Sequence, residues 1–299
     1  MGNRCVICAK EATIYNRCIY HLRDEDRINA AGLIEDENLF NHLAISSSTK
    51  LDTNNPNLRF LSGQTYDQFV TKVKNKDKLR VILLVPLHES KLIDIIREYC
   101  NYFFYAPIVP LQSLNLASIK SEIDPELVKL GFVMSGYPLY SVDKIKDKLL
   151  KEVELAGRSD SIVIGITENH DLKLLISEKK SVIDIFEDQQ TEFNPVIGHV
   201  YSNNNILIFS TRRFGINVVE RMCKIVTRSI CNLLGLGYCV FWRCLLNDVN
   251  EDEYRYAINI DTYPSDLCPV CLHKLYYLFK FDLERRKTML ETFRKKYVF

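Results

Sequence analysis

The segment that decides the fold is Gly235–Cys244, GLGYCVFWRC, together with Cys268–Cys271, CPVC, which follows after an insert. Each stretch holds a pair of cysteines, and two thiolate pairs on separate turns can supply the four ligands of a tetrahedral zinc site. The sequence therefore predicts a structural zinc site whose ligands are Cys239, Cys244, Cys268 and Cys271. Four buried cysteines without a metal are the alternative.

A long helix is predicted immediately upstream, over residues 215–234. Its apolar residues cover a broad face, and Gly235 and Gly237 follow at its end, where a left-handed cap favours glycine. From about residue 60 onward, alternating helix and strand patterns predict a mixed α/β core. The expected helices are 23–43, 64–76, 89–103, 141–156 and 275–298, and the expected strands are 79–87, 104–111, 161–166, 171–177, 181–185 and 205–210.

A second cysteine cluster lies at the N-terminus and consists of Cys5, Cys8, Cys18 and His21. Three thiolates and one imidazole at this spacing are typical of a small zinc finger, which needs the metal to fold because its own core is too small. A tail with stray cysteines is the alternative. The other three cysteines, Cys100, Cys223 and Cys231, have apolar neighbours and are predicted to pack in the core.

Composition narrows the classes of protein. The chain has 299 residues with 39 basic and 38 acidic side chains. No apolar run approaches the ~18 residues that span a bilayer, so no membrane association is expected. The N-terminus lacks a signal-peptide stretch, which indicates a reducing, cytoplasmic location where cysteines bind metal in preference to forming disulfides. A net charge of +1 lacks the excess of basic residues that is typical of nucleic-acid-binding proteins, so binding to a nucleic acid would need a local basic patch.

Four regions are expected on this basis. Residues 1–22 form the zinc-finger-like module, and residues 23–58 form a helix and linker arm. Residues 59–275 form the α/β domain, and residues 276–299 form a basic C-terminal helix.

Around the glycine turn the chain resembles the archaemetzincins, zinc-metalloprotease-like proteins with the pattern His-Glu-x-x-His-x-x-Gly-x-x-His-Cys-x4-Cys and then Cys-x2-Cys. The segment 235–244 fits the glycine turn and the first cysteine pair, and 267–271 fits the second. Residues 164–172, 193–198 and 206–213 resemble the strands that precede the family's active-site helix. The resemblance implies a metzincin-like α/β fold with a mixed sheet, a long former active-site helix and a four-cysteine zinc module.

The catalytic positions of that family are not matched. The register set by Gly235 and Cys239 places Arg228 at the first histidine of the pattern and Ser229 at the glutamate. It places Asn232 at the second histidine and Tyr238 at the third. No histidine occurs between His199 and His273. Catalytic zinc of this kind needs three imidazoles and a general base. The chain is therefore predicted not to be an enzyme. Arg228 is expected either to hold an anion in the old cleft or to be an ordinary surface arginine.

An inactive scaffold suggests binding. The Asn-, Lys- and Ile-rich composition and the eroded site indicate a reduced parasitic genome, and the chain resembles the microsporidian ribosome dormancy factors. This resemblance implies a hibernation role: occupying empty ribosomes near the tRNA exit region and inhibiting translation. A peptide-binding pseudoprotease, using an edge strand near 205–210, is the alternative. We expect two structural Zn²⁺ ions, a monomer by itself, no small-molecule substrate, and a ribosomal partner in which rRNA phosphates and ribosomal proteins are contacted. The candidate rRNA contacts are Arg212, Arg213, Arg285, Arg286, Lys287, Arg294, Lys295 and Lys296.

Overall fold

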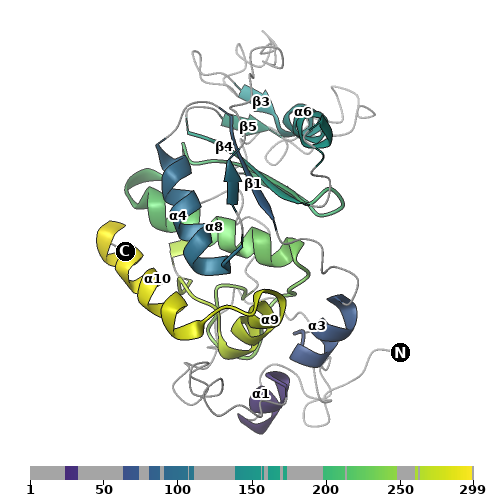
Figure 1. The fold of residues 1–299 in the computed structure, drawn as a ribbon, viewed down its shortest axis with the longest axis vertical. Helices are drawn as coiled ribbons and strands as arrows, with labels where there is room; N and C mark the ends of the chain where they lie inside the picture. Colours follow the sequence, from purple (N-terminus) through teal and green to yellow (C-terminus); the bar gives the residue numbers. More distant parts are fainter. Residues whose placement is uncertain are drawn as a thin grey trace, which may run out of the picture.

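The computed structural model describes residues 24–32, 63–73, 81–87, 91–106, 108–110, 139–155, 157, 161–168, 171–173, 198–212, 214–247, 260–261 and 263–297. Within them, a five-stranded mixed sheet forms the centre of an α/β fold (Figure 1). Its order is β2 (Ile108–Pro110), β1 (Ile82–Pro86), β4 (Ile162–Thr167), β7 (Ile206–Ser210) and β6 (Gly198–Tyr201). The first four are parallel and β6 is antiparallel. The predicted fold class is confirmed.

The central strands are apolar because both faces of the sheet are covered. Every residue of β4 and β7 is buried. One face packs against α4 (Leu92–Phe104) and α8 (Val218–Leu233), and the other packs against α6 (Val142–Leu155). Figure 1 shows this three-layer arrangement. The outer layer also carries a small parallel pair, β3 (Leu139–Ser141) and β5 (Asp171–Lys173).

The sheet edge differs from expectation. The strand predicted at 205–210 is β7, which lies between β4 and β6 and is therefore not an edge strand. The edge on this side is β6, which shares only Gly198 with the segment 193–198 that resembles a family strand. A Cβ at Gly198 would lie 2.5 Å from the Ile208 carbonyl oxygen, so only glycine allows β6 to pair this closely with β7.

The predicted C-terminal helix is two helices, α9 (Pro269–Phe279) and α10 (Leu283–Tyr297). Lys280 ends α9 in the left-handed conformation, with φ of 49°. Asp282 then caps α10 by accepting the Arg285 amide at 2.9 Å. The helix α10 lies along α4 (Figure 1) and buries Leu290 and Phe293 in the same core as the sheet.

The N-terminal arm contributes a short helix to this body. The helix predicted over 23–43 is observed as α1 (Asp24–Ala30), and residues 33–62 lie outside the described ranges. The helix α3 (Tyr66–Val73) begins with a reciprocal cap, in which the Gln68 amide donates to Thr65 Oγ1 and the Thr65 amide donates to Gln68 Oε1. The predicted strand at 181–185 also lies outside the described residues. In the described part of the chain, no helix is long and apolar enough to cross a membrane.

Candidate metal centre

Four sulfur atoms meet at the C-terminal end of α8. The Sγ atoms of Cys239, Cys244, Cys268 and Cys271 all lie within 4.8 Å of one another, and all four residues are buried. A zinc–thiolate tetrahedron with Zn–S of about 2.3 Å separates its sulfurs by roughly 3.8 Å. The cluster therefore fits a zinc ion with four sulfur ligands, as the spacing predicted.

The first cysteine pair is positioned by a turn and by one asparagine. Gly235, with φ of 90°, reverses the chain after α8. The Asn247 side chain then closes the loop: its Oδ1 accepts the Cys244 amide at 2.7 Å, and its Nδ2 donates to the carbonyls of Cys239 at 2.8 Å and Trp242 at 3.0 Å. One buried amide group thus fixes both ends of the first pair.

The second pair is held at the start of α9. Cys268 is the N-cap, and the proline that follows it occupies the first helical turn, where a missing N–H costs nothing. The amides of Cys268 and Leu246 donate to the Cys244 sulfur at 3.3 and 3.4 Å. These two hydrogen bonds tie the start of α9 and the first cysteine loop to the same sulfur atom.

One thiol of the cluster, that of Cys239, differs in acidity from the other cysteines, whereas burial raises the pKa of Cys244 and of Cys268. Burial opposes the charged form of Cys239, but hydrogen bonds with Cys244, Cys268 and Cys271 outweigh it and hold its pKa well below the ordinary value. Burial raises the pKa of Cys100, Cys223 and Cys231, which therefore remain thiols. These three are core residues, and the metal-binding chemistry belongs to the cluster.

Gln64, which has no motif of its own, supports the glycine turn. Its Oε1 accepts the Gly237 amide at 3.0 Å and its Nε2 donates to the Gly235 carbonyl at 3.2 Å. Lys274, buried on α9, donates to the Gln64 carbonyl and to its Oε1. These hydrogen bonds fix the backbone just before Cys239 and join residues that are 171 to 210 positions apart in the sequence. Because the partners are so distant, the spacing of the motif could not predict the role of Gln64.

The N-terminal arm also contacts the cysteine loops. Arg27 of α1 donates to the Phe241 carbonyl, between the first two cysteines, at 2.8 Å. His273 of α9 pairs its Nδ1 with the Ala31 carbonyl at 2.7 Å and stacks on the Tyr66 ring at 3.9 Å. Burial lowers the pKa of His273, which stays neutral and has a packing role. The predicted cluster of Cys5, Cys8, Cys18 and His21 lies outside the described residues.

Arg228, which the register aligns with the first histidine of the family pattern, is not a surface residue. It is 5% exposed, and its Nη1 donates to the carbonyls of Leu245 at 3.1 Å and Asn247 at 2.6 Å. Its guanidinium lies 5.8 Å from the ring centre of Tyr238 and 5.3 Å from that of Tyr263. The expectation of a surface arginine is wrong, because this cation ties α8 to the cysteine loop.

Two further residues that the family register aligns with catalytic positions, Ser229 and Asn232, lie on the same helix as Arg228. Ser229 is buried, and its Oγ has no hydrogen-bond partner among the described residues. Asn232 is half-buried in the last turn of α8.

The predicted rRNA contacts differ in how far their side chains are exposed and in whether they are paired with an acid. Arg286 is buried: it donates to the Phe103 carbonyl at 3.0 Å and lies 4.2 Å from that ring, so it anchors α10 and cannot reach a phosphate. Arg294 pairs with Asp266 at 2.6 Å, and Lys296 pairs with Glu98 at 2.8 Å. The exposed cations of α10 are Arg285, Lys287, Lys295 and Lys296, of which Lys296 is the one paired with Glu98. Arg212 is half-buried in the turn before α8, and Arg213 lies outside the described residues.

Comparison with known proteins gives partial matches to one family. Over 71 residues the chain is 44% identical to archaemetzincin-1 of Rattus norvegicus and 37% identical to archaemetzincin-2 of Homo sapiens, each match covering 23% of this chain. The matches span only 13% and 18% of those relatives. These matches support an archaemetzincin-like fold.

No protein-family model matches the chain. A solved zinc-dependent peptidase from Methanocorpusculum labreanum aligns over 65% of this chain and 99% of its own, with 14% identity and a TM-score of 0.39.

The role of Asn247 can be tested by truncation. We expect Asn247→Ala to lower the free energy of unfolding by about 2–4 kcal/mol, because it leaves the Cys244 amide and two carbonyls unpaired in a buried loop. Urea unfolding measures the change. Asn203→Ala, in the exposed turn between β6 and β7, is the matched control and should stay within about 0.5 kcal/mol of wild type. Equal stability of the two variants would contradict this role.

Proposed function

We propose that this protein is a non-catalytic binding protein on an archaemetzincin-like scaffold, and that it binds inactive ribosomes as a dormancy factor. The observation that carries the non-catalytic part is Arg228. A guanidinium committed to two carbonyls and flanked by two tyrosine rings occupies the position where the resemblance expects a zinc ligand. A permanent cation there opposes a divalent metal.

The four-cysteine centre has a structural role in this proposal. Cys239, Cys244, Cys268 and Cys271 would hold one zinc ion with no position left open, and a closed tetrahedral site has no place for a substrate or a reactive water. Bound zinc would cross-link the loop that follows α8 to the start of α9. Arg27 and Gln64 then dock the N-terminal arm against that cross-link.

The exposed side of α10 is the proposed rRNA contact. Its buried side anchors the helix to α4 through Arg286, while Arg285, Lys287 and Lys295 are exposed to solvent. Cations on a fixed helix can neutralise several phosphates with little loss of conformational entropy. A local patch of this kind reconciles rRNA binding with a net charge of only +1.

Charge reversal tests the proposal. We expect the triple variant Arg285→Glu, Lys287→Glu, Lys295→Glu to bind vacant ribosomes roughly ten- to a hundredfold more weakly, and wild-type binding to fall steeply with salt. Sedimentation of purified protein with vacant ribosomes through sucrose measures both. The matched control reverses Lys144, Lys148 and Lys151 on α6, which covers the other face of the sheet. Absence of the wild-type protein from the ribosomal fractions would rule out the dormancy role.

A peptide-binding pseudoprotease remains the second candidate, and the edge position of β6 favours it. The strand pairs with β7 on one side, and in the described sheet its other side has no neighbouring strand. An extended peptide could add there by β-augmentation. Val200→Pro on β6 would abolish peptide capture in that case and leave ribosome binding unchanged.

A further inference from the structure

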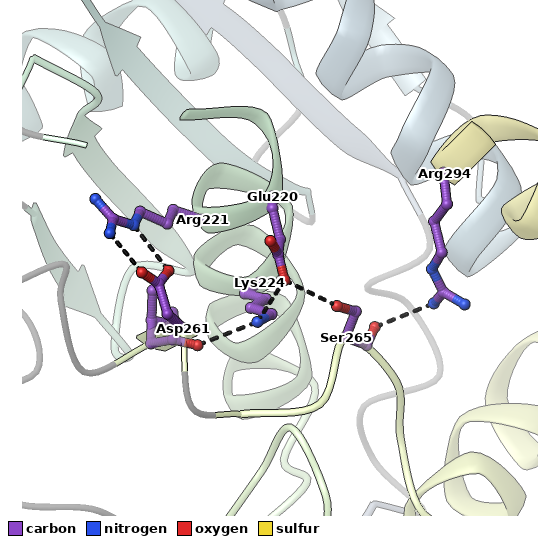
Figure 2. Close-up of polar contacts among 7 residues, drawn as sticks. Glu220, Arg221, Lys224, Asp261, Ser265 and Arg294 are labelled. Carbon is purple, nitrogen blue, oxygen red and sulfur yellow. Dashed lines mark hydrogen bonds and ion pairs between the residues drawn. The ribbon is translucent and has the colours of Figure 1, made fainter. Parts of the chain in front are cut away.

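The outer face of α8 is crossed by a segment that we call the strap, residues 260–261 and 263–267. It leads into Cys268 and lies between α8 and α10 (Figure 2). Figure 2 shows Glu220, Arg221 and Lys224 of α8 directed toward the strap, and Arg294 of α10 directed toward its far end. The strap is therefore held from both helices by side chains.

The contacts at the near end of the strap are ionic. Arg221 donates two hydrogen bonds to the Asp261 carboxylate, from Nε to Oδ1 at 2.8 Å and from Nη2 to Oδ2. Lys224, 2% exposed, donates to the Ile260 carbonyl at 3.2 Å and pairs with Glu220 at 2.7 Å. Asp261 thus supplies the only negative charge that the described strap residues bring to this part of α8.

The far end of the strap is held by Arg294 of α10, which pairs with the Asp266 carboxylate at 2.6 Å. Ser265 Oγ donates to Glu220 Oε1 at 3.4 Å, and its carbonyl accepts from Arg294 at 3.4 Å. Tyr263, in the middle, packs its ring by the Arg228 guanidinium. The strap therefore covers Arg221, Lys224 and Arg228, which recur at the three- and four-residue spacing that places side chains on one face of a helix.

In the Arg221–Asp261 pair, the guanidinium is the kind of group that binds anions, and the Asp261 carboxylate of the same chain is the anion that it binds. A guanidinium presents its planar pair of N–H groups to a carboxylate and to a phosphate in the same bidentate geometry. The Asp261 side chain is 32% exposed, so the pair meets solvent and can exchange for another anion. Arg221 also donates to the Phe214 carbonyl, which places the turn that carries Arg212 beside it.

We propose that the α8 face carrying Arg221 and Lys224 is a second phosphate-binding surface for RNA, and that Asp261 occupies it in the free protein as an intramolecular competitor. This inference rests on the proposed rRNA-binding function and extends it. When RNA binds, a backbone phosphate takes the place of the carboxylate on Arg221. Displacement of Asp261 leaves two cations, Arg221 and Lys224, against the single acid Glu220, so the surface becomes net positive only when its partner is present.

The test replaces Asp261 by asparagine, which removes the negative charge of the competing carboxylate and keeps the shape of the side chain. Asp261→Asn should bind a short fluorescently labelled RNA about three- to tenfold more tightly than wild type in anisotropy titrations, with a steeper fall in affinity as salt is raised. Asp147→Asn on α6 is the matched control, because it changes the net charge equally and the Asp147 side chain, which pairs with Lys146, is 64% exposed. Adding Arg221→Gln to Asp261→Asn should abolish the gain.

The outcomes separate the two proposals. If wild type binds RNA through α10 but Asp261→Asn binds no better than Asp147→Asn, the α8 surface is wrong and the rRNA-binding proposal stands. If neither wild type nor Asp261→Asn binds RNA, the proposed function fails. A gain that persists in the Arg221→Gln double variant would also overturn the α8 surface. Thermal melts of each variant establish that the fold is retained.

Discussion

Replacing Cys268 by serine is expected to remove one zinc ion per chain and to lower the free energy of unfolding by more than about 4 kcal/mol. The loss is large because the metal would cross-link the loop after α8 to the start of α9, at a point where other parts of the chain converge. Arg27, Gln64 and Asp266 all hydrogen-bond to backbone next to the ligands. Elemental analysis of purified protein and urea unfolding measure the two effects.

The matched control for this variant is Cys231→Ser. Cys231 is as buried as Cys268 but lies on α8 outside the cluster, so its replacement should cost about 1–3 kcal/mol and leave the zinc content unchanged. Retention of full zinc content by Cys268→Ser would contradict the four-cysteine site.

The same measurement counts the sites. If Cys5, Cys8, Cys18 and His21 also bind zinc, wild type holds two ions and Cys268→Ser holds one. If the N-terminal cluster binds none, the values are one and zero.

The four-cysteine centre could be predicted from the sequence because its information is local. Two pairs of cysteines, a glycine turn and a proline at a helix start each act within a few residues, and α8 follows from its apolar periodicity. The strands β1, β4 and β7 were predictable for the same reason, since continuous apolar runs are typical of strands buried on both faces.

What the sequence did not predict is long-range or lacks a strong local signal. Asn247 and Gln64 are polar residues without a motif, and their roles arise from partners that the fold brings to them. The break between α9 and α10 contains neither glycine nor proline: Lys280 adopts the left-handed conformation, and the one local sign was Asp282, three residues before the amide that it caps. Arg286 looked like part of a basic run because charge along a sequence does not distinguish a solvated face from an anchor.

Arg228→Met should destabilise the protein by about 3 kcal/mol or more, an effect unusual for an arginine. Truncation removes the donor to the Leu245 and Asn247 carbonyls and leaves both unpaired in a buried loop, and it removes the cation beside two tyrosine rings. Arg97→Met is the matched control, because Arg97 is 44% exposed and pairs only with Asp94 three residues away in the described structure. Its cost should stay within about 0.5 kcal/mol.

The same position tests whether the scaffold is inactive. If Arg228 is the internal cation that closes the old cleft, Arg228→His should be destabilised like Arg228→Met and should gain neither a further zinc ion nor peptidase activity, since Asn232 and Tyr238 still replace the other two histidines. Zinc bound in excess of wild type, with hydrolysis of a peptide substrate, would instead show that the cleft is open. Stability, metal content and hydrolysis measured on one variant thus separate a structural arginine from one that merely covers a working site.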